Sequence, residues 1–449
     1  MARQIKELAA FVATTTWDDV PASVQHHTKL ILLDTLGVIL AGADRPEVRL
    51  LREQLGTGSG ATVYASGFPS HDSRTAALLN GIAGRSIELC EGLRLVSGQA
   101  AMQVLPGVLA VGEQARRTGR DMLAALLLGY DVAARLAGGF TPRPLAHQNG
   151  QVSLLAAAAA GARLRGLDAA GISRAMRIAT TLLLTPSYTN AVAGATALNV
   201  AGGMSSFAAS LAPELALAGF EAQDDAIAQS LGELVGSGFT DEGMLDELGS
   251  TWHITRNYFR LYACCNPIHP ALDCLQHVLA ELKPRHDQIA RIDFATYRFA
   301  SVMRNPDPPN FFASKYSLPH AAATMVVRGH AGHAALDDLA VHDPAIAALR
   351  HRVTVTEDPA MSALAPRLRP ARVTVVLADG RSATHGCDSH RGDFYVPFAE
   401  DELRSKFREL ANVVLTQEGA ELVERSIDDC DNWDNIDVLT SLCRRHGRF

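Results

Sequence analysis

The chain has 449 residues, of which 47% are hydrophobic and 20% are charged, and its formal net charge is −7. This composition is typical of a folded globular protein and excludes a disordered chain. The negative charge argues against a nucleic-acid-binding protein that works by neutralising phosphates. We expect two domains, because single hydrophobic cores stop growing at about 250–300 residues.

The cysteines and the apolar runs predict a cytoplasmic protein that does not contact a membrane. Seven cysteines without regular spacing fit a reducing compartment better than a disulfide framework. The N-terminal segment 1–21 has no apolar run long enough for a signal peptide. The most apolar run of small residues, Leu154 to Ala162, is far shorter than the roughly 20 residues of a membrane span.

In the first half of the chain, apolar residues recur at helical spacing, and Ala, Leu and Gly dominate. The predicted helices are 4–14, 20–43, 73–90, 106–118, 122–136, 153–164, 167–179, 201–218 and 226–231. The small residues at close intervals in 73–90 would let neighbouring helices approach each other. One short strand is expected at 61–66. Helix therefore packs on helix in a largely α domain.

In the second half, from about Ile292 onward, the alternation of apolar and polar residues that is typical of strands appears at length for the first time. The predicted strands are 291–300, 352–357, 371–377 and 382–387, with predicted helices at 270–282 and 317–328. Asp379-Gly380 is a strong hairpin signal between the last two strands. We interpret this region as an α+β unit with an antiparallel sheet. Helical patterns return at 398–416 and 418–427.

The predicted fold class is mainly α with an α+β lid. We place a large all-helical domain at 1–258, a smaller α+β lid domain at 259–393, and a C-terminal return to the helical domain at 394–449. The cleft between the two domains is the expected active site, because domain junctions are common places for small-molecule pockets.

The segment 259–273, FRLYACCNPIHPALD, lies at the seam between these two halves. Its prolines exclude a simple helix interior. The polar cluster predicts either a pocket wall or a connecting loop with a buried cysteine pair. Arg260 would be costly to bury without a partner. An anionic substrate could be that partner, since guanidinium matches carboxylate geometry, and a structural salt bridge is the alternative.

Other candidate residues stand at helix ends. His147 lies in a loop before an apolar helix and is either a proton-transfer group or a solvent-facing loop residue. Lys315 and His320 lie near a predicted helix start, where a carboxylate could bind, although an ordinary capped helix fits equally well. Glu88 and Glu91 could do acid–base work, or they could form a solvated helix end.

Several reaction templates are absent from the sequence: it has no Walker loop, no G-x-S-x-G elbow and no H-E-x-x-H motif. His385, Cys387 and His390 resemble a metal-binding trio. We expect no metal there, because the sequence shows no fourth ligand. A metal-dependent lyase remains a third hypothesis.

Several segments together resemble the MmgE/PrpD family, which includes 2-methylcitrate dehydratases, cis-aconitate decarboxylases and iminodisuccinate epimerases. The resemblance covers almost the whole chain. It rests on the order and spacing of LLDTLGVILAGA, AALLNGIAGRSIEL, HQNGQVSLLAAAAAGARLRGLD, LNVAGGMSSFAASLAPELALAGF, YACCNPIHPALD, KYSLPHAAA and DGRSATHGCDSHRGDFYVPFAEDELRSKFREL. It implies a helical domain with an α+β lid, commonly as a homodimer, with the active site between the domains.

The resemblance also implies site residues. Glu88 keeps the carboxylate of the family's D-F-D-D-T segment, and His147 and His269 keep two family histidines. Arg260 stands where the family has a lysine before its Y-P-C-C segment. His320 replaces the tyrosine of an S-L-P-Y segment.

Three other positions depart from the family pattern. Gln99 replaces a histidine, so a group that titrates near neutrality is lost. Thr196 and Asn199 stand where the K-R-L-H-P-G segment has its lysine and histidine. The loss of that lysine predicts a substrate that is less anionic than a tricarboxylate, and it argues against standard 2-methylcitrate or cis-aconitate chemistry.

We therefore expect a lyase or isomerase that needs no cofactor and moves a proton at a carbon next to a carboxylate or carbonyl of a small organic acid. The alternative is a catalytically silent family member that binds a ligand or a partner. The candidate catalytic residues are His147, His320, Glu88 and His269. The candidate substrate-binding residues are Arg260, Gln99, Asn199, Lys315 and Tyr262. We expect a homodimer that binds no nucleic acid.

Overall fold

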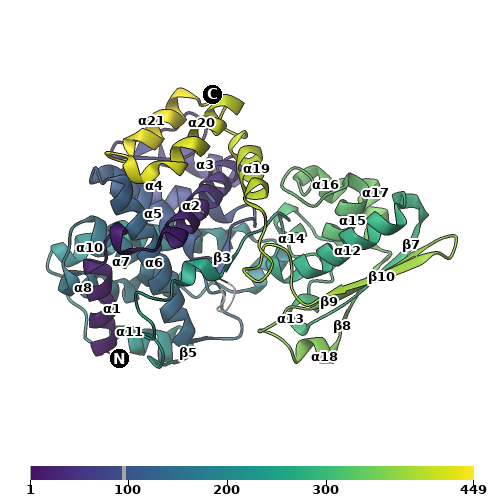
Figure 1. The fold of residues 1–449 in the computed structure, drawn as a ribbon, viewed down its shortest axis with the longest axis horizontal. Helices are drawn as coiled ribbons and strands as arrows, with labels where there is room; N and C mark the ends of the chain where they lie inside the picture. Colours follow the sequence, from purple (N-terminus) through teal and green to yellow (C-terminus); the bar gives the residue numbers. More distant parts are fainter. Residues whose placement is uncertain (1, 94–97, 449) are drawn as a thin grey trace.

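A computed structural model of the chain describes residues 2–93 and 98–448. It contains a large group of packed helices and a smaller unit built on a four-stranded sheet (Figure 1). Both termini belong to the helical part. The predicted fold class, mainly α with a smaller α+β unit, is confirmed. The domain boundaries after residues 258 and 393 remain a prediction.

The first part of the chain is almost entirely helical, as its alanine-rich periodicity predicts. Its helices are α1 (Ala2–Thr14), α2 (Ala22–Gly42), α3 (Pro46–Leu55), α4 (Ser73–Arg85), α5 (Ala100–Gln114), α6 (Gly119–Gly139), α7 (Val152–Leu164), α8 (Ala169–Ala179), α9 (Thr189–Ala193), α10 (Val200–Leu217) and α11 (Ala226–Gln229). Short strand pairs are made by β1 (Ala61–Thr62) with β2 (Ser70–His71), β3 (Gly92–Leu93) with β6 (Asn257–Tyr258), and β4 (Phe140–Pro142) with β5 (Gly236–Phe239).

Small residues allow α4 and α10 to cross closely. A Cβ on Gly81 would lie 2.8 Å from the Cα of Gly203, and a Cβ on Gly203 would lie 2.5 Å from the carbonyl oxygen of Leu78. Larger side chains at these two positions would force the helices apart, because packed interiors leave no spare volume. The close crossing fixes the axis of α4, whose C-terminal end points toward the smaller unit.

The structure corrects several predicted boundaries: the helix expected at 398–416 is α19 (Glu400–Ala411), the strand expected at 291–300 ends at Thr296, and two other corrections bear on the site. The helix expected at 73–90 ends at Arg85, and the chain then turns at Glu88, whose φ is +51°. The helix expected to start at Pro106 starts instead at Ala100. Proline at a helix start is a common signal, but here Pro106 is buried inside α5, where tertiary packing outweighs the local preference.

The smaller unit has the strand order β10-β9-β7-β8. Its strands are β7 (Ile289–Thr296), β8 (Val353–Glu357), β9 (Ala371–Leu377) and β10 (Ser382–Cys387), and its helices are α12 (His269–Leu282), α13 (Arg298–Ser301), α14 (Phe311–Ser314), α15 (Leu318–Arg328), α16 (Asp338–His342), α17 (Pro344–Arg350) and α18 (Pro359–Ser362). The expected antiparallel sheet is a mixed one, because β7 and β8 pair in parallel. The long helical connection between them permits this, since parallel neighbours need a crossover.

The helices α12 and α15 cover one face of this sheet and form a second hydrophobic core with it. Alternate residues of β9 (Ala371, Val373, Val375 and Leu377) are buried, as the period-two pattern predicts. The connection from β6 to α12 is the seam segment 259–273. It therefore runs from the helical part into the smaller unit.

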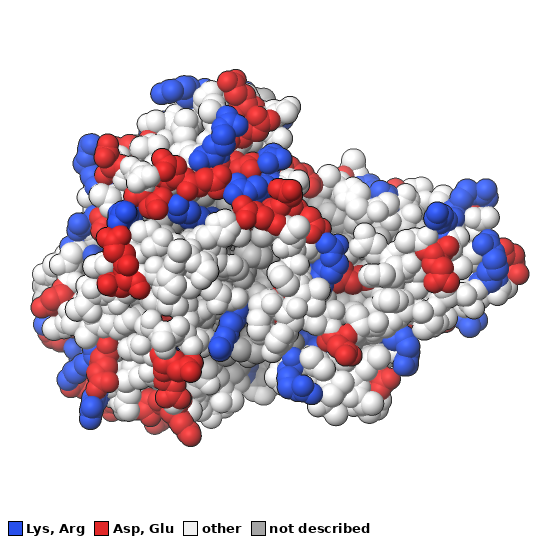
Figure 2. Space-filling view, viewed as in Figure 1, with Lys and Arg blue, Asp and Glu red and all other residues white. Residues whose placement is uncertain are grey.

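The C-terminal helices α19 (Glu400–Ala411), α20 (Gln417–Asp428) and α21 (Asp437–Arg445) return to the helical part (Figure 1). On α19, the buried Lys406 donates to a carboxylate oxygen of Asp34 at 2.5 Å and to the carbonyl oxygen of Leu89 at 2.9 Å. Positive and negative side chains are interspersed over this region of the surface (Figure 2). The C-terminal return thus holds the segment that follows α4.

Among the described residues, one helix, α6, is long and apolar enough to cross a membrane by length and composition, and the shorter apolar helix α7 contains the run 154–162. In the structure, 83% of the most apolar window of α6 is buried among the other helices. That burial fits a core helix.

Candidate active site

A cavity of about 240 Å³ lies between the helical part and the smaller unit. The helical part contributes the end of α4, the loop before α7 and the loop around Tyr188. The seam segment, Phe299, Tyr316 and Arg369 contribute the opposite wall. The described lining residues are Arg85, Glu88, Leu93, Gly98, Gln99, Pro142, Arg143, Pro144, Ala146, His147, Gln148, Tyr188, Tyr258, Arg260, Cys265, Asn266, Pro267, Phe299, Tyr316 and Arg369.

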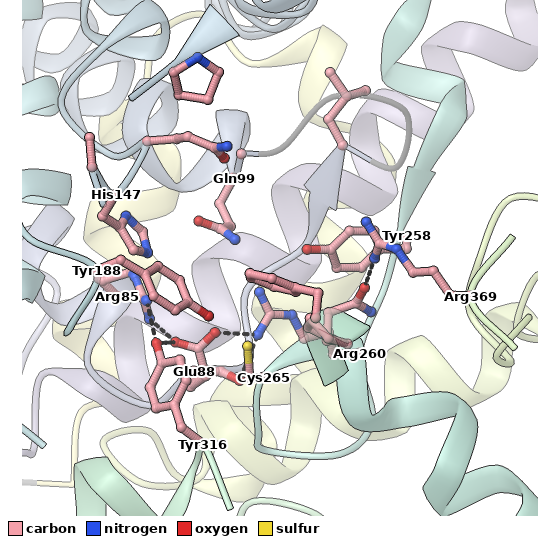
Figure 3. Close-up of a pocket in the computed structure, with 18 of the residues that line it drawn as sticks. Arg85, Glu88, Gln99, His147, Tyr188, Tyr258, Arg260, Cys265, Tyr316 and Arg369 are labelled. Carbon is pink, nitrogen blue, oxygen red and sulfur yellow. Dashed lines mark hydrogen bonds and ion pairs between the residues drawn. The ribbon is translucent and has the colours of Figure 1, made fainter. Parts of the chain in front are cut away.

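A buried polar cluster centred on Glu88 forms the floor of the cavity (Figure 3). Arg260 donates from Nη1 to the Glu88 carboxylate at 2.7 Å, and Arg85 donates to its other oxygen. The Tyr316 hydroxyl donates to Glu88 at 2.8 Å and accepts from Arg85 at 2.8 Å. Arg260 also donates to the backbone carbonyl of Glu88 at 3.1 Å. One carboxylate therefore lies between two guanidinium groups.

The charges of this cluster fix its protonation. Burial alone would raise the pKa of Glu88, but the positive charges of Arg85 and Arg260 outweigh it and hold that pKa well below its usual range. Burial would likewise lower the pKa of Arg85, but Glu88 reverses that effect and raises it. At neutral pH Glu88 is therefore ionised, and as a carboxylate shared by two cations it is a weak base.

The backbone around Glu88 is held in an unusual conformation. A non-glycine residue at positive φ costs about 1–3 kcal/mol and persists only where its surroundings enforce it. The Lys406 ammonium binds the next carbonyl, that of Leu89. The buried Glu91 accepts from the Tyr130 hydroxyl at 2.7 Å and from the Ala101 amide at 2.9 Å. These contacts fix the turn that carries Glu88 into the cavity.

His147 lines the same cavity, close to Tyr188 and Arg85 (Figure 3). Its backbone N–H donates to the carbonyl of Pro186 at 2.8 Å, and its ring stacks on Tyr188 with centroids 5.7 Å apart. The backbone N–H of Asn149 donates to its Nδ1 at 3.2 Å. Nδ1 is therefore an acceptor, and the proton of the neutral ring is on Nε2.

Burial, followed by the nearby Arg85 charge, lowers the pKa of His147 to about 3. In the free protein at neutral pH, His147 is thus an uncharged hydrogen-bond donor through Nε2. A neutral imidazole of this kind can donate to an oxygen on which negative charge develops.

Two further cations line the cavity. Arg369 donates to the side-chain oxygen of Asn266, and its guanidinium lies 5.8 Å from the centre of the Tyr258 ring. Arg143 donates to the backbone carbonyls of Glu233 at 2.8 Å and Leu234 at 3.3 Å. Within 2–93 and 98–448, neither guanidinium forms an ion pair with a carboxylate. The cavity is therefore suited to an anion.

Four predicted site residues line this cavity: Glu88, Gln99, His147 and Arg260. The structure shows that Arg260 is paired with Glu88, which agrees with the salt-bridge alternative. The roles proposed for these four residues in catalysis and substrate binding remain predictions.

The other five predicted residues lie outside the cavity lining, and their proposed roles remain predictions. Lys315 is buried and donates to the carbonyl of Leu336 at 2.6 Å, and burial lowers its pKa to about 7. His320 is buried beside Arg350, whose Nη1 is 3.4 Å from its Nδ1. Burial and the Arg350 charge lower the pKa of His320 to about 3. Both residues belong to the core of the smaller unit.

The remaining three, Tyr262, His269 and Asn199, are also absent from the cavity lining. His269 donates from Nε2 to the carbonyl of Cys264 at 3.1 Å, and burial lowers its pKa to about 3. The Tyr262 hydroxyl donates to Asp273 at 2.7 Å. Asn199 is buried at the start of α10 and, among the described residues, its amide has no hydrogen-bond partner.

Sequence reasoning missed Arg85, Tyr188 and Arg369. An arginine in the last turn of a helix made of small residues was a usable signal for Arg85, because such a helix buries most of its surface. Tyr188 and Arg369 lie in irregular segments that reach the cavity only through the tertiary fold, and no local pattern marks them.

The three residues that resembled a metal site do not come together. His385 stacks on His277, the Cys387 sulfur contacts the Cys274 sulfur, and His390 is within hydrogen-bonding distance of Asn266. Among the described residues there is no group of three or more His, Cys, Asp or Glu side chains placed to hold a metal ion.

The buried histidines predict a protein that loses stability in mild acid. His147, His269 and His320 each have a pKa lowered to about 3, whereas an unfolded histidine titrates near 6.5. Unfolding therefore takes up protons between these values. The stabilisation is complete above about pH 6.5, and stability falls as the pH is lowered toward 3.

Near pH 5, three such groups together lower the free energy of unfolding by up to about 4 kcal/mol for each unit by which the pH falls. Urea denaturation at pH 7.5, 6 and 5 should show the midpoint falling steeply, and less steeply in His320→Gln. A midpoint that does not change between pH 7.5 and 5 would contradict the burial of these rings as neutral groups.

Comparisons with known proteins cover nearly the whole chain. A sequence model described as the MmgE/PrpD N-terminal domain matches residues 6–238, and one described as the MmgE/PrpD C-terminal domain matches residues 262–432. A cis-aconitate decarboxylase from Aspergillus terreus (strain NIH 2624 / FGSC A1156) is 22% identical over 97% of this chain and 95% of its own length.

Two further relatives have similar names. The cis-aconitate decarboxylase-like protein oryM from Aspergillus oryzae is 23% identical over 97% of this chain and 96% of its own length. A cis-aconitate decarboxylase from Homo sapiens is 23% identical over 94% of this chain and 90% of its own length.

Proposed function

Because the chain belongs to the MmgE/PrpD family, we propose that it is an enzyme that moves a proton at a carbon next to a carboxylate or carbonyl of a small organic acid, without a cofactor. The names of its relatives support a lyase of the dehydratase or decarboxylase type. An isomerase would use the same intermediate. At 22–23% identity the relatives' substrate does not transfer to this chain.

The observation that carries this proposal is the charge of the cavity. Four guanidinium groups line it, those of Arg85, Arg143, Arg260 and Arg369, against one carboxylate among the described lining residues, Glu88. Arginine forks match carboxylates in geometry and charge. The Glu88 carboxylate is paired with Arg85 and Arg260. The cations that remain available to a ligand are therefore Arg143 and Arg369.

The chemistry follows from what the cavity can stabilise. Dehydration, decarboxylation and epimerisation next to a carboxylate all place negative charge on an enolate-like oxygen. We assign the Nε2–H of His147 to that oxygen as a preorganised donor in a largely buried site. Burial raises the pKa of Tyr188 well above its usual value, so its hydroxyl keeps the proton that a carbanion could accept.

The carboxylate anchor gives a testable expectation. Arg369→Gln should raise KM for the substrate about 10- to 100-fold, because a charge-assisted hydrogen bond contributes about 1.5–3 kcal/mol. It should change kcat much less, since the anchor acts on ground and transition state alike. Arg372→Gln, an exposed change on β9 outside the cavity, is the matched control. An unchanged KM in Arg369→Gln would remove Arg369 from the substrate site.

The substrate class can be tested directly. The protein is incubated with mono-, di- and tricarboxylic acids, including β-hydroxy, α,β-unsaturated and imino acids, and products are followed by NMR. We expect turnover of a mono- or dicarboxylate without added metal or cofactor. Turnover that requires an added cofactor, or that is fastest with a tricarboxylate, would contradict the proposal.

A further inference from the structure

Two cysteines from distant parts of the sequence meet in the smaller unit, away from the cavity described above. Cys274 lies on α12 and Cys387 ends β10, and their sulfur atoms are 3.4 Å apart. The nearby His277 and His385 come from the same helix and strand, and their rings stack at 4.3 Å. The stacked rings and the helix–strand packing hold the two sulfurs next to each other.

The two thiols differ in exposure. Cys274 is fully buried, whereas Cys387 is partly exposed. Cys387 lines two surface hollows: Cys274, His277 and Asp388 belong to one, and Arg372 and Asp388 belong to the other. Cys387 is therefore the more accessible of the two thiols to a small oxidant, because Cys274 has no exposed surface.

The hydrogen bonds of the pair fit a two-step exchange. The Cys387 thiol donates to the carbonyl of Pro270 at 3.4 Å, and the Cys274 thiol donates toward Cys387. The hydrogen bond to Cys387, followed by burial, raises the pKa of Cys274. Cys274 thus stays a thiol until its neighbour has reacted.

We propose that Cys274 and Cys387 form a redox-active pair that closes to a reversible disulfide with low-molecular-weight disulfides. The Cys387 thiolate attacks one sulfur of the oxidant, forms a mixed disulfide and releases one thiolate. Cys274 then loses its proton and attacks the Cys387 sulfur, which releases the second thiolate. Two protein thiols are oxidised, one small disulfide is reduced to two thiols, and both protons pass to the released thiolates.

The geometry permits this closure. A disulfide requires a sulfur–sulfur distance of about 2.05 Å. The sulfurs must therefore approach by somewhat more than 1 Å, which rotation of the two side chains can supply. The adjacent pair Cys264–Cys265 offers a contrast, because both residues are buried, although Cys265 lines the candidate cavity.

The test uses the whole native protein and oxidised glutathione, with intact-mass and peptide mass spectrometry. We expect the wild type to lose two hydrogen atoms, retain no glutathione and yield a peptide cross-linked between Cys274 and Cys387, and dithiothreitol should reverse this change. Cys274→Ser should instead accumulate one glutathione on Cys387. Cys387→Ser should stay unmodified, as should Cys264 and Cys265 in every variant.

Three results would overturn the proposal. They are a stable glutathione adduct on Cys387 of the wild type, no reaction at Cys387, and a cross-link that involves other cysteines. Because the wild type is compared before and after oxidation, the test does not depend on how well the variants fold.

Discussion

Glu88→Gln is expected to lower the free energy of unfolding by about 3–5 kcal/mol, because it leaves the buried Arg85 and Arg260 without their shared counter-charge. Glutamine keeps the volume and can still accept a hydrogen bond, so the loss reports the charge itself. Chemical denaturation of the two proteins at pH 7.5 measures it. A double variant that also carries Arg260→Met should regain part of this loss, since one of the two uncompensated charges is gone.

A matched control separates the stability effect from the active site. Asp131 and Arg135 form another buried ion pair, on α6, and neither lines the cavity. Asp131→Asn should destabilise the protein similarly, yet its folded fraction should keep wild-type kcat. Glu88→Gln should lose activity even where it is folded. A Glu88→Gln protein as stable as the wild type would contradict the buried cluster.

His147→Ala is expected to lower kcat about 10²- to 10³-fold, the usual loss when one donor to a developing oxyanion is removed. His147→Gln should recover part of that loss, because the glutamine amide can donate a hydrogen bond but cannot transfer protons near neutral pH. Steady-state kinetics with the best substrate of the acid panel measure both. If glutamine is as inactive as alanine, His147 transfers a proton rather than donating a hydrogen bond.

Two comparisons sharpen this result. His320→Ala removes a buried histidine outside the cavity, so a loss of kcat as large as that of His147→Ala would place the chemistry elsewhere.

The pKa of His147 in the free protein is about 3, so the ring stays neutral between pH 5 and 8. The kcat/KM should therefore show no acid limb from this residue in that range.

The fold could be predicted largely from local patterns. The errors of that prediction arise where tertiary contacts determine the secondary structure or the strand pairing. Strands β9 and β10 match the predicted ranges because alternation and the Asp379-Gly380 turn are local signals. The parallel pairing of β7 with β8 could not be predicted, since it depends on how the intervening helices cross the sheet. After α4 ends at Arg85, Glu88 adopts a left-handed conformation, and no residue preference marks such a turn at a glutamate.

The candidate site was only partly predictable for the same reason. Arg260 and His147 could be found because each is a polar residue in a proline-interrupted segment beside an apolar helix. Lys315 and His320 stand at a helix start that looked equally suitable, but that end is buried in the smaller unit. Sequence alone does not say which end of a helix faces a cavity. Arg369 lies more than one hundred positions beyond Arg260 and meets the cavity only in the folded chain.

Hydrogen exchange at carbon tests the central claim most directly. The wild type and His147→Ala are incubated in deuterated buffer with each acid of the panel, and NMR follows deuterium at the carbon next to the carboxylate or in the product. We predict enzyme-dependent incorporation with at least one mono- or dicarboxylate, and at least a tenfold slower rate in His147→Ala. An acid that binds in the cavity but never exchanges or turns over would contradict the account and identify a binding protein instead.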